Sequence, residues 1–189
     1  MIQSKGDQRR VVFLDRDGTI IIDKHYLSNP ADVELESRAA LGLARLAELG
    51  FRLIGITNQS GVAKGMFDMA AVHRVNDRVA ELLEPKGVLI EHWYVCPHDD
   101  GDQCACRKPA PGMMYEAARE RGVDLSQSFV IGDKLSDVEL GNATGAFGIL
   151  VQTGKGAALS ATALERGHRV VRDLDEAASV IAAMLAQGE

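Results

Sequence analysis

The chain has 189 residues, of which 46% are apolar and 25% charged, and its formal net charge is −6. This length and balance predict one folded domain, residues 1–189, and exclude a disordered chain, while the acidic charge argues against a nucleic-acid partner. The polar start and the lack of an apolar run of about 18 residues predict a cytoplasmic protein with no signal peptide and no membrane partner.

Strand and helix patterns alternate along the chain. Short apolar runs rich in β-branched residues predict buried strands, and apolar residues at helical spacing predict helices. Ser37, Asp68 and Asp173 are the expected N-caps, and Glu176 would complete a capping box with Asp173. Residues 153–157 are expected to form a short loop. In chain order we expect strand 10–14, helix 37–49, strand 51–56, helix 68–83, strand 91–95, helix 111–121, strand 128–131, helix 137–143, strands 147–151 and 168–171, and a final helix that begins after Asp173.

This alternation predicts an α/β fold, a Rossmann-like and mostly parallel sheet with helices on both faces. The gaps between the expected strands are filled by single helices and loops, so no large cap domain is expected. Ligands of such sheets bind at the carboxyl ends of the strands. The polar residues at the ends of the first four expected strands should therefore line one crevice, and they are Asp15, Thr57, Cys96 and Asp133.

Acidic residues follow two of these strands. Asp15 and Asp17 come directly after the first strand, and Gly18 permits the turn that would bring both side chains into a cleft. Asp133 adds a third carboxylate after the fourth strand. A carboxylate can attack phosphorus when a hard divalent cation and an ammonium group, such as that of Lys108, neutralise its repulsion from phosphate. The competing interpretation is a polar turn with no chemical role.

The three cysteines of the chain all fall between residues 96 and 106, beside a histidine. Three thiolates and one imidazole form a common closed set of ligands for structural zinc. The polar loop between them has little apolar surface with which to fold, so we expect one structural Zn²⁺ to staple it. The competing interpretation is ordinary core thiols beside a surface histidine. The predicted zinc ligands are Cys96, His98, Cys104 and Cys106.

Four segments resemble, in order, the four motifs of the haloacid dehalogenase-like phosphatases. The resemblance implies that Asp15 attacks phosphorus and that Asp17 acts first as general acid and then as general base. It implies that Thr57 and Lys108 stabilise the phosphoryl group during transfer. The four segments are Asp15–Thr19, Thr57–Ser60, Arg107–Pro109 and Gly132–Asp137.

The same resemblance implies a catalytic Mg²⁺. Its expected ligands are the Asp15 carboxylate, the backbone carbonyl of Asp17 and the Asp133 carboxylate. Asp137 is expected to order the surrounding loop or to bind through water.

A narrower resemblance, to the D-glycero-D-manno-heptose 1,7-bisphosphate 7-phosphatases, rests on segments 23–26, 57–67, 96–98, 104–109, 111–113 and 153–155. It implies a monomer that hydrolyses the 7-phosphate of a small sugar bisphosphate. It also implies that the product is a precursor of the heptose in lipopolysaccharide or a related glycoconjugate. A guanidinium suits phosphate oxygens, so Arg107 is expected to bind the distal phosphate. The implied substrate contacts are Asp23, Lys24, His25, Tyr26, Thr57, Asn58, Gln59, Ser60, Arg107, Lys108 and Lys134.

Other activities share parts of this pattern. A histidinol phosphatase would have the same fold, motifs and zinc loop, but Arg107 predicts a second anionic group where histidinol phosphate carries a cation. The acidic charge argues against a phosphatase of polynucleotide ends. A non-enzymatic phospho-aspartate receiver would not need Asp17 or the zinc loop. A zinc-binding interaction module would not need the carboxylates.

Overall fold

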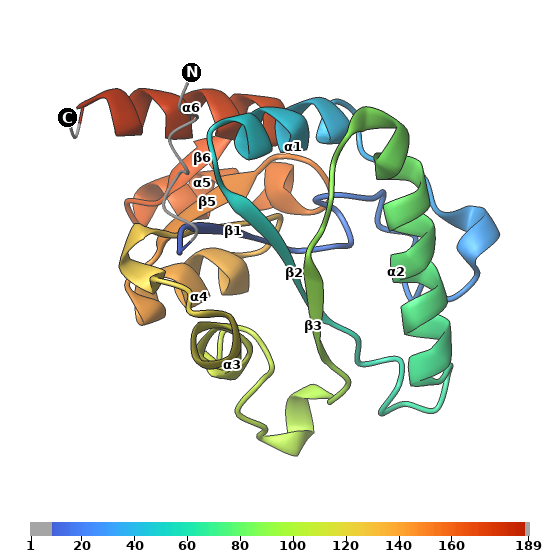
Figure 1. Cartoon of the computed structure of the whole chain (residues 1–189). Coiled ribbons are helices and arrows are strands. Elements are labelled where there is room, and N and C mark those ends of the chain that lie inside the picture. Colours follow the sequence, from blue (N-terminus) through green and yellow to red (C-terminus); the bar gives the residue numbers. More distant parts are fainter. Residues whose placement is uncertain (1–8, 188–189) are drawn as a thin grey trace.

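Within residues 9–187, which the computed structural model describes, the strands form one parallel sheet of six in the order β3-β2-β1-β4-β5-β6 (Figure 1). The strands are β1 (Val11–Leu14), β2 (Arg52–Asn58), β3 (His92–Cys96), β4 (Phe129–Gly132), β5 (Phe147–Val151) and β6 (Arg169–Val171). The helices are α1 (Ala39–Glu48), α2 (Met69–Leu83), α3 (Gly112–Arg121), α4 (Leu135–Thr144), α5 (Gly156–Glu165) and α6 (Leu174–Gln187). The predicted Rossmann-like α/β fold is confirmed.

The order in which successive strands are added to the sheet changes direction between β1 and β4, and this position is the switch point of the sheet. The chain runs outward through β2 and β3 on one side of β1, and through β4, β5 and β6 on the other. β1 is apolar and fully buried because it pairs with β2 and β4 and is covered on both faces. Parallel sheets of this kind bind ligands at such a switch point, which places the residues after β1 and β4 side by side.

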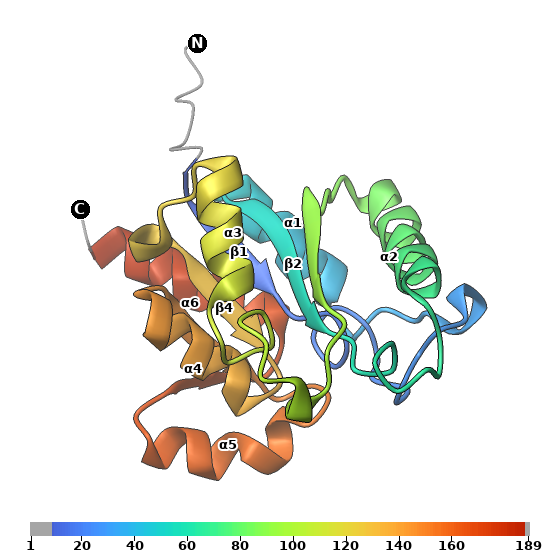
Figure 2. The same ribbon diagram turned by 90° about the horizontal axis from the view of Figure 1, so that it is seen from below.

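Helices cover both faces of the sheet (Figures 1 and 2). Apolar side chains of α1, α2 and α6 pack together with one face in the larger core. Side chains of α3 and α4 pack with the opposite face, and α5 joins that side through a small cluster with α4 and β5. The connection from β1 to β2 holds α1, and that from β2 to β3 holds α2, so the described chain has no room for a large cap domain.

Three local expectations were wrong. Ser37 does not cap α1, because the residue before the helix is Arg38 in a left-handed conformation (φ 62°), with no side-chain cap. Helix α5 was not predicted, since only Gly156 and Ala163 of its ten residues are buried and its apolar pattern is weak. Asp173 accepts from the Glu176 amide as expected, but the Glu176 carboxylate accepts from the Arg172 amide instead of closing the capping box.

No helix among residues 9–187 is long and apolar enough to cross a bilayer.

Candidate active site

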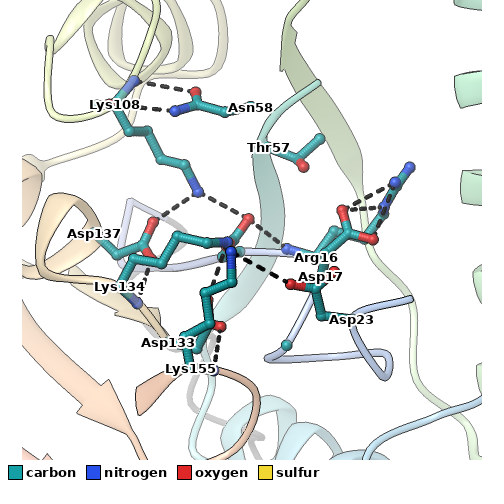
Figure 3. Close-up of polar contacts among 12 residues, drawn as sticks. Arg16, Asp17, Asp23, Thr57, Asn58, Lys108, Asp133, Lys134, Asp137 and Lys155 are labelled. Carbon is teal, nitrogen blue, oxygen red and sulfur yellow. Dashed lines mark hydrogen bonds and ion pairs between the residues drawn. The ribbon is translucent and has the colours of Figure 1, made fainter. Parts of the chain in front are cut away.

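The carboxyl ends of β1 and β4 bring three aspartates and two lysines together (Figure 3). The Lys108 ammonium lies 2.8 Å from Asp15 Oδ1 and 2.7 Å from Asp137 Oδ1, and it donates to the Ile56 carbonyl at 2.9 Å. The Lys134 ammonium lies 3.3 Å from Asp15 Oδ2 and 3.2 Å from Asp133 Oδ1. Asp15 is therefore paired with both lysines, whereas Asp137 is paired with Lys108 alone and Asp133 with Lys134 alone.

Gly18 permits this arrangement. Its φ of +85° lies in the left-handed region, and a Cβ atom there would sit 2.3 Å from Asp133 Oδ2. The turn after β1 therefore passes directly over the Asp133 carboxylate, where any side chain would collide. The same oxygen accepts a hydrogen bond from the Lys155 amide at 2.9 Å.

The lysines decide which carboxylates are ionised. Burial opposes ionisation of Asp15, but Lys108 and Lys134 outweigh it and hold the pKa of Asp15 well below its ordinary value. Burial, followed by the charge of Asp15, raises the pKa of Asp133 to about 6. Burial also raises the pKa of Asp137. Of the three carboxyls, Asp15 is therefore the one whose ionised form the surrounding charges favour.

The oxygens of Asp15, Asp133 and Asp137 could hold a cation, since one oxygen from each lies within 4.8 Å of the other two. Asp133 Oδ1 is buried, and its contact among the described residues is the ion pair with Lys134 at 3.2 Å, a charge that a bound cation would replace. Carboxylate oxygens are the donors that hard divalent cations prefer. Asp137 also accepts a hydrogen bond from the Lys134 amide at 3.1 Å, so it orders the loop before α4, as one of its two predicted roles requires.

Asp17 lies apart from this cluster, and its side chain points away from Lys108 and Lys134 (Figure 3). Its carboxylate accepts hydrogen bonds from Arg16 Nε at 3.0 Å and from Gln59 Nε2 at 2.8 Å. The same Gln59 nitrogen donates to Thr57 Oγ1 at 2.8 Å. Thr57 is the penultimate residue of β2, since that strand extends two residues beyond its predicted end.

A cavity of about 430 Å³ opens beside these groups. Nine of the eleven predicted substrate contacts line it, and the other two do not. Thr57 is buried behind Gln59, and the ammonium of Lys24 pairs instead with Glu34 at 2.5 Å. Lys24 therefore stays a prediction that this geometry does not support. The nine are Asp23, His25, Tyr26, Asn58, Gln59, Ser60, Arg107, Lys108 and Lys134.

Lys155 lines the cavity although it was not predicted to. It lies four residues after β5, and its ammonium is 4.0 Å from Asp23 Oδ2. Its position after the end of a strand was a signal that could have identified it, because the neighbouring strands place their site residues in the same way.

Three loops around the cavity are joined through Lys64. Its ammonium lies 2.7 Å from the hydroxyl of Tyr26, in the loop after β1, and 3.5 Å from Asp99, in the loop after β3. Tyr26 and its neighbour His25 both adopt left-handed backbone conformations, with φ of 59° and 51°. Non-glycine residues seldom do so, and these two mark a loop that is held in an unusual shape beside the cavity.

The four predicted zinc ligands lie together at the end of β3 and in the loop that follows it, because Cys96 is the last residue of that strand and not the first residue after it. The three Sγ–Sγ distances among Cys96, Cys104 and Cys106 are 3.2, 3.4 and 3.6 Å, and His98 Nδ1 lies 3.3 Å from Cys106 Sγ. A zinc ion bound tetrahedrally at about 2.3 Å from sulfur spaces its ligands about 3.7 Å apart. The spacing and the donor set therefore fit one metal ion with no open position.

This loop also positions Arg107 and Lys108. The Arg107 guanidinium donates to the His98 carbonyl at 3.1 Å and to Asp100 Oδ1 at 2.5 Å. The backbone of Lys108 exchanges two hydrogen bonds with the Asn58 side chain, at 3.1 and 3.2 Å. The cysteine cluster, Arg107 and the lysine of the carboxylate cluster thus form one connected structure.

Sequence comparison places the chain among known phosphatases. A family model described as HAD-hydrolase-like matches residues 105–177. The D-glycero-beta-D-manno-heptose-1,7-bisphosphate 7-phosphatase of Pseudomonas aeruginosa is 34% identical over 174 residues, which cover 92% of this chain and 98% of that protein. The D-glycero-alpha-D-manno-heptose-1,7-bisphosphate 7-phosphatase of Photorhabdus laumondii is 38% identical over 143 residues, which cover 72% of this chain and 78% of that one.

Comparison with solved structures agrees. The crystal structure of D,D-heptose 1,7-bisphosphate phosphatase from Bordetella bronchiseptica, complexed with magnesium and phosphate, superposes with a TM-score of 0.84 at 34% identity, covering 95% of this chain and 99% of that one. The corresponding enzyme from Burkholderia thailandensis gives a TM-score of 0.68 at 30% identity, covering 92% and 98%. The chain therefore belongs to the haloacid dehalogenase-like hydrolases, within the family of the D-glycero-D-manno-heptose 1,7-bisphosphate 7-phosphatases.

Proposed function

We propose that the protein hydrolyses the 7-phosphate of D-glycero-D-manno-heptose 1,7-bisphosphate through a phospho-aspartate intermediate. The observation that carries the proposal is the Asp15 carboxylate, which two lysines hold ionised at the switch point of the sheet. Asp15 and Arg107 line the same cavity, so a substrate with two phosphates has one group for each. The named activity of relatives that match nearly the whole chain supports this substrate.

In the first half-reaction an Asp15 oxygen attacks phosphorus, and the bond between phosphorus and the sugar oxygen breaks. Asp17 donates its proton to that oxygen, so the sugar leaves as a neutral alcohol. Lys108 offsets negative charge on the nucleophile and on the transferring phosphoryl group. The resemblance assigns the same role to Thr57, whose hydroxyl is buried behind Gln59 and does not line the cavity. Asp15 now carries the phosphoryl group, and Asp17 is ionised.

In the second half-reaction the ionised Asp17 takes a proton from water, and the water oxygen attacks the phosphorus of phospho-Asp15. The bond between phosphorus and Asp15 breaks, which releases inorganic phosphate and restores the carboxylate. The Asp15 and Asp133 carboxylates and the Asp17 carbonyl would hold Mg²⁺, which when bound supplies positive charge against the repulsion between Asp15 and phosphate.

Affinity for Mg²⁺ should depend on pH through Asp133. The pKa of this buried carboxyl is raised to about 6, so it is mostly protonated below that pH, and a proton competes with the cation for it. The pKa of Asp15 is lowered, so Asp15 does not add to the effect. We expect the Mg²⁺ affinity to fall about tenfold per pH unit below about pH 6 and to be nearly constant above about pH 7. Calorimetric titration across this range measures it, and a flat profile would contradict the role of Asp133.

Arg107 should determine the preference for a second phosphate. A charge-assisted hydrogen bond from a guanidinium to phosphate is worth about 1.5–3 kcal/mol, so Arg107→Leu should lower kcat/KM for the heptose bisphosphate by about 10²-fold. The same variant should change kcat/KM for an aryl monophosphate by less than about threefold, because that substrate has no distal phosphate. Arg119→Leu, at an exposed position of α3, is the matched control. Equal losses on both substrates would show that Arg107 does not bind the distal phosphate.

The activity is tested by phosphate release, with Mg²⁺, from a matched panel. The panel contains both anomers of heptose 1,7-bisphosphate, fructose 1,6-bisphosphate, histidinol phosphate and an aryl phosphate. A preference of about 10²-fold in kcat/KM for one heptose bisphosphate, about 2.7 kcal/mol of discrimination, is the expected result. The relatives that match this chain include phosphatases named for the beta anomer and for the alpha anomer, so the two anomers are assayed separately. Preference for histidinol phosphate would overturn the substrate, and no release from any member would overturn the activity.

A further inference from the structure

Arg16 is the largest fully buried side chain of the protein within its described part, and it lies between the two aspartates of the first motif. Its guanidinium donates two hydrogen bonds to Asp17, from Nε to Oδ2 at 3.0 Å and from Nη2 to Oδ1 at 3.2 Å. A buried charge is costly unless it is paired and hydrogen-bonded, so this pairing is the arrangement that makes burial of Arg16 tolerable.

Helix α2 supplies the third contact of Arg16. The Nη1 atom donates to Oδ1 of Asn76, which is 60 residues away in sequence and only 3% exposed. The amide nitrogen of Asn76 has no hydrogen-bond partner among the described residues. A buried amide with an unpartnered donor is unfavourable by itself, so its carbonyl contact with Arg16 is the interaction that accounts for an asparagine at this position of α2.

Gln59 holds Asp17 from the other side. Its amide nitrogen lies 2.8 Å from both Asp17 Oδ2 and Thr57 Oγ1 and joins the acid to the end of β2. Asp17 Oδ2 thus receives hydrogen bonds from two residues and also lies 2.9 Å from Arg16 Nη2, while Oδ1 has one longer contact at 3.2 Å. Oδ1 is therefore the less heavily bonded of the two oxygens, and the contacts of Oδ2 fix how the carboxylate is oriented.

We propose that Arg16, anchored by Asn76, is a positioning residue for Asp17, and that it holds the Asp17 carboxylate in the orientation from which Asp17 transfers protons. This inference rests on the proposed function, since it assigns the means by which the acid and base of that reaction is oriented. The side chains of Arg16 and Asn76 do not line the cavity and reach it through Asp17, while the Arg16 backbone amide donates to Asp15 Oδ1 at 2.8 Å and is kept in any side-chain variant. The contacts of Arg16 with Asp17 and Asn76, here called the clamp, fix the direction in which the Asp17 carboxylate points in both half-reactions.

The clamp predicts an effect that depends on the leaving group. A sugar or alkyl oxygen leaves as an alcohol only if Asp17 protonates it, whereas dinitrophenolate leaves without a proton. Hydrolysis of phospho-Asp15 needs Asp17 as base whichever group has left. Loosening the clamp should therefore slow the first turnover of an alkyl phosphate, spare the first turnover of dinitrophenyl phosphate, and slow the later release of phosphate from both.

The experiment follows dinitrophenolate and phosphate release in rapid mixing, with Mg²⁺, for wild type, Arg16→Met and Asn76→Leu. Arg16→Met and Asn76→Leu should lower kcat/KM for the alkyl phosphate by about 10²-fold. On dinitrophenyl phosphate they should give a burst of about one phenolate per protein at a rate within about threefold of wild type, followed by slow turnover. Asn76→Asp keeps an acceptor for Arg16 Nη1, so this variant should retain wild-type kinetics where Asn76→Leu does not.

Controls separate the outcomes. Asn142→Leu makes the same change at an exposed position of α4 and should leave all rates unchanged. Thermal melting shows whether each variant is folded. If Arg16→Met does not fold, the inference is tested with Asn76→Leu alone. Equal losses of the first turnover on both substrates, or a failure of Asn76→Asp to retain the kinetics, would overturn the inference. A wild-type protein that releases no phosphate from either substrate would instead overturn the proposed function.

Discussion

Asp15→Asn should abolish phosphate release, with kcat lowered by at least about 10⁴-fold on every substrate. The carboxamide of asparagine has nearly the same shape as the carboxylate, but it is neutral and cannot form the phospho-enzyme. Losing a nucleophile removes the reaction path itself, so its effect exceeds that of any substitution that only weakens a contact. Acid-quenched protein analysed by intact mass should carry a phosphoryl group in wild type and none in the variant.

The variant must be shown to fold. The lowered pKa of Asp15 means that its ionised form stabilises the folded state above the ordinary carboxyl range, so Asp15→Asn should also lower the melting temperature at neutral pH. Lys108 keeps its contact with Asp137, which limits this loss. Asp77→Asn, at an exposed position of α2, is the matched control and should behave as wild type. Turnover of Asp15→Asn within tenfold of wild type would show that another group attacks phosphorus.

Cys104→Ser should have the largest effect on stability. It replaces one of four ligands in a cluster whose sulfur and nitrogen atoms lie within 4.8 Å of one another, and a serine oxygen is a poor zinc ligand. Bound zinc should fall from about one equivalent to nearly none, and the free energy of unfolding should fall by about 3–5 kcal/mol. Metal analysis and chemical denaturation measure the two effects.

The same substitution should alter substrate binding, because the loop holds the Arg107 guanidinium through the His98 carbonyl. We expect KM for the bisphosphate to rise more than KM for an aryl monophosphate. Ala105→Ser places the same hydroxyl at an exposed neighbouring position and should retain both zinc and stability. A Cys104→Ser protein with a full equivalent of zinc and an unchanged melting curve would contradict a structural metal at this cluster.

The sequence was sufficient to predict the sheet and which carboxylates, lysine and cysteines lie together at the ends of its strands. β1 and β4 are short buried apolar runs, and the residues directly after such strands in a parallel sheet must meet at one edge. The convergence of Asp15, Asp133 and Lys108 follows from that rule and from the motif order. The cysteine spacing likewise identified the four atoms that lie together.

Features set by packing between distant segments could not be predicted. Nothing in the first motif indicates that Arg16 is buried or that its partner is Asn76, because that contact depends on how α2 rotates against the sheet. The pairing of Lys24 with Glu34 depends on the path of the loop after β1. Helix α5 contributes few buried side chains, so the apolar pattern from which helices are predicted is nearly absent there.

The bridge from Tyr26 through Lys64 to Asp99 has a consequence for how selectivity can change. It links the loops after β1, β2 and β3 into one rim around the cavity, while the Asp15 and Asp133 carboxylates are held separately by their lysines at the ends of the strands. Exchanging one loop for that of a relative would remove its contact with Lys64, Tyr26 or Asp99 and leave the other two loops without the residue that they bind. A change of substrate preference in this scaffold is therefore expected to require exchanging all three loops together, and such an exchange can leave the carboxylate and lysine cluster unchanged.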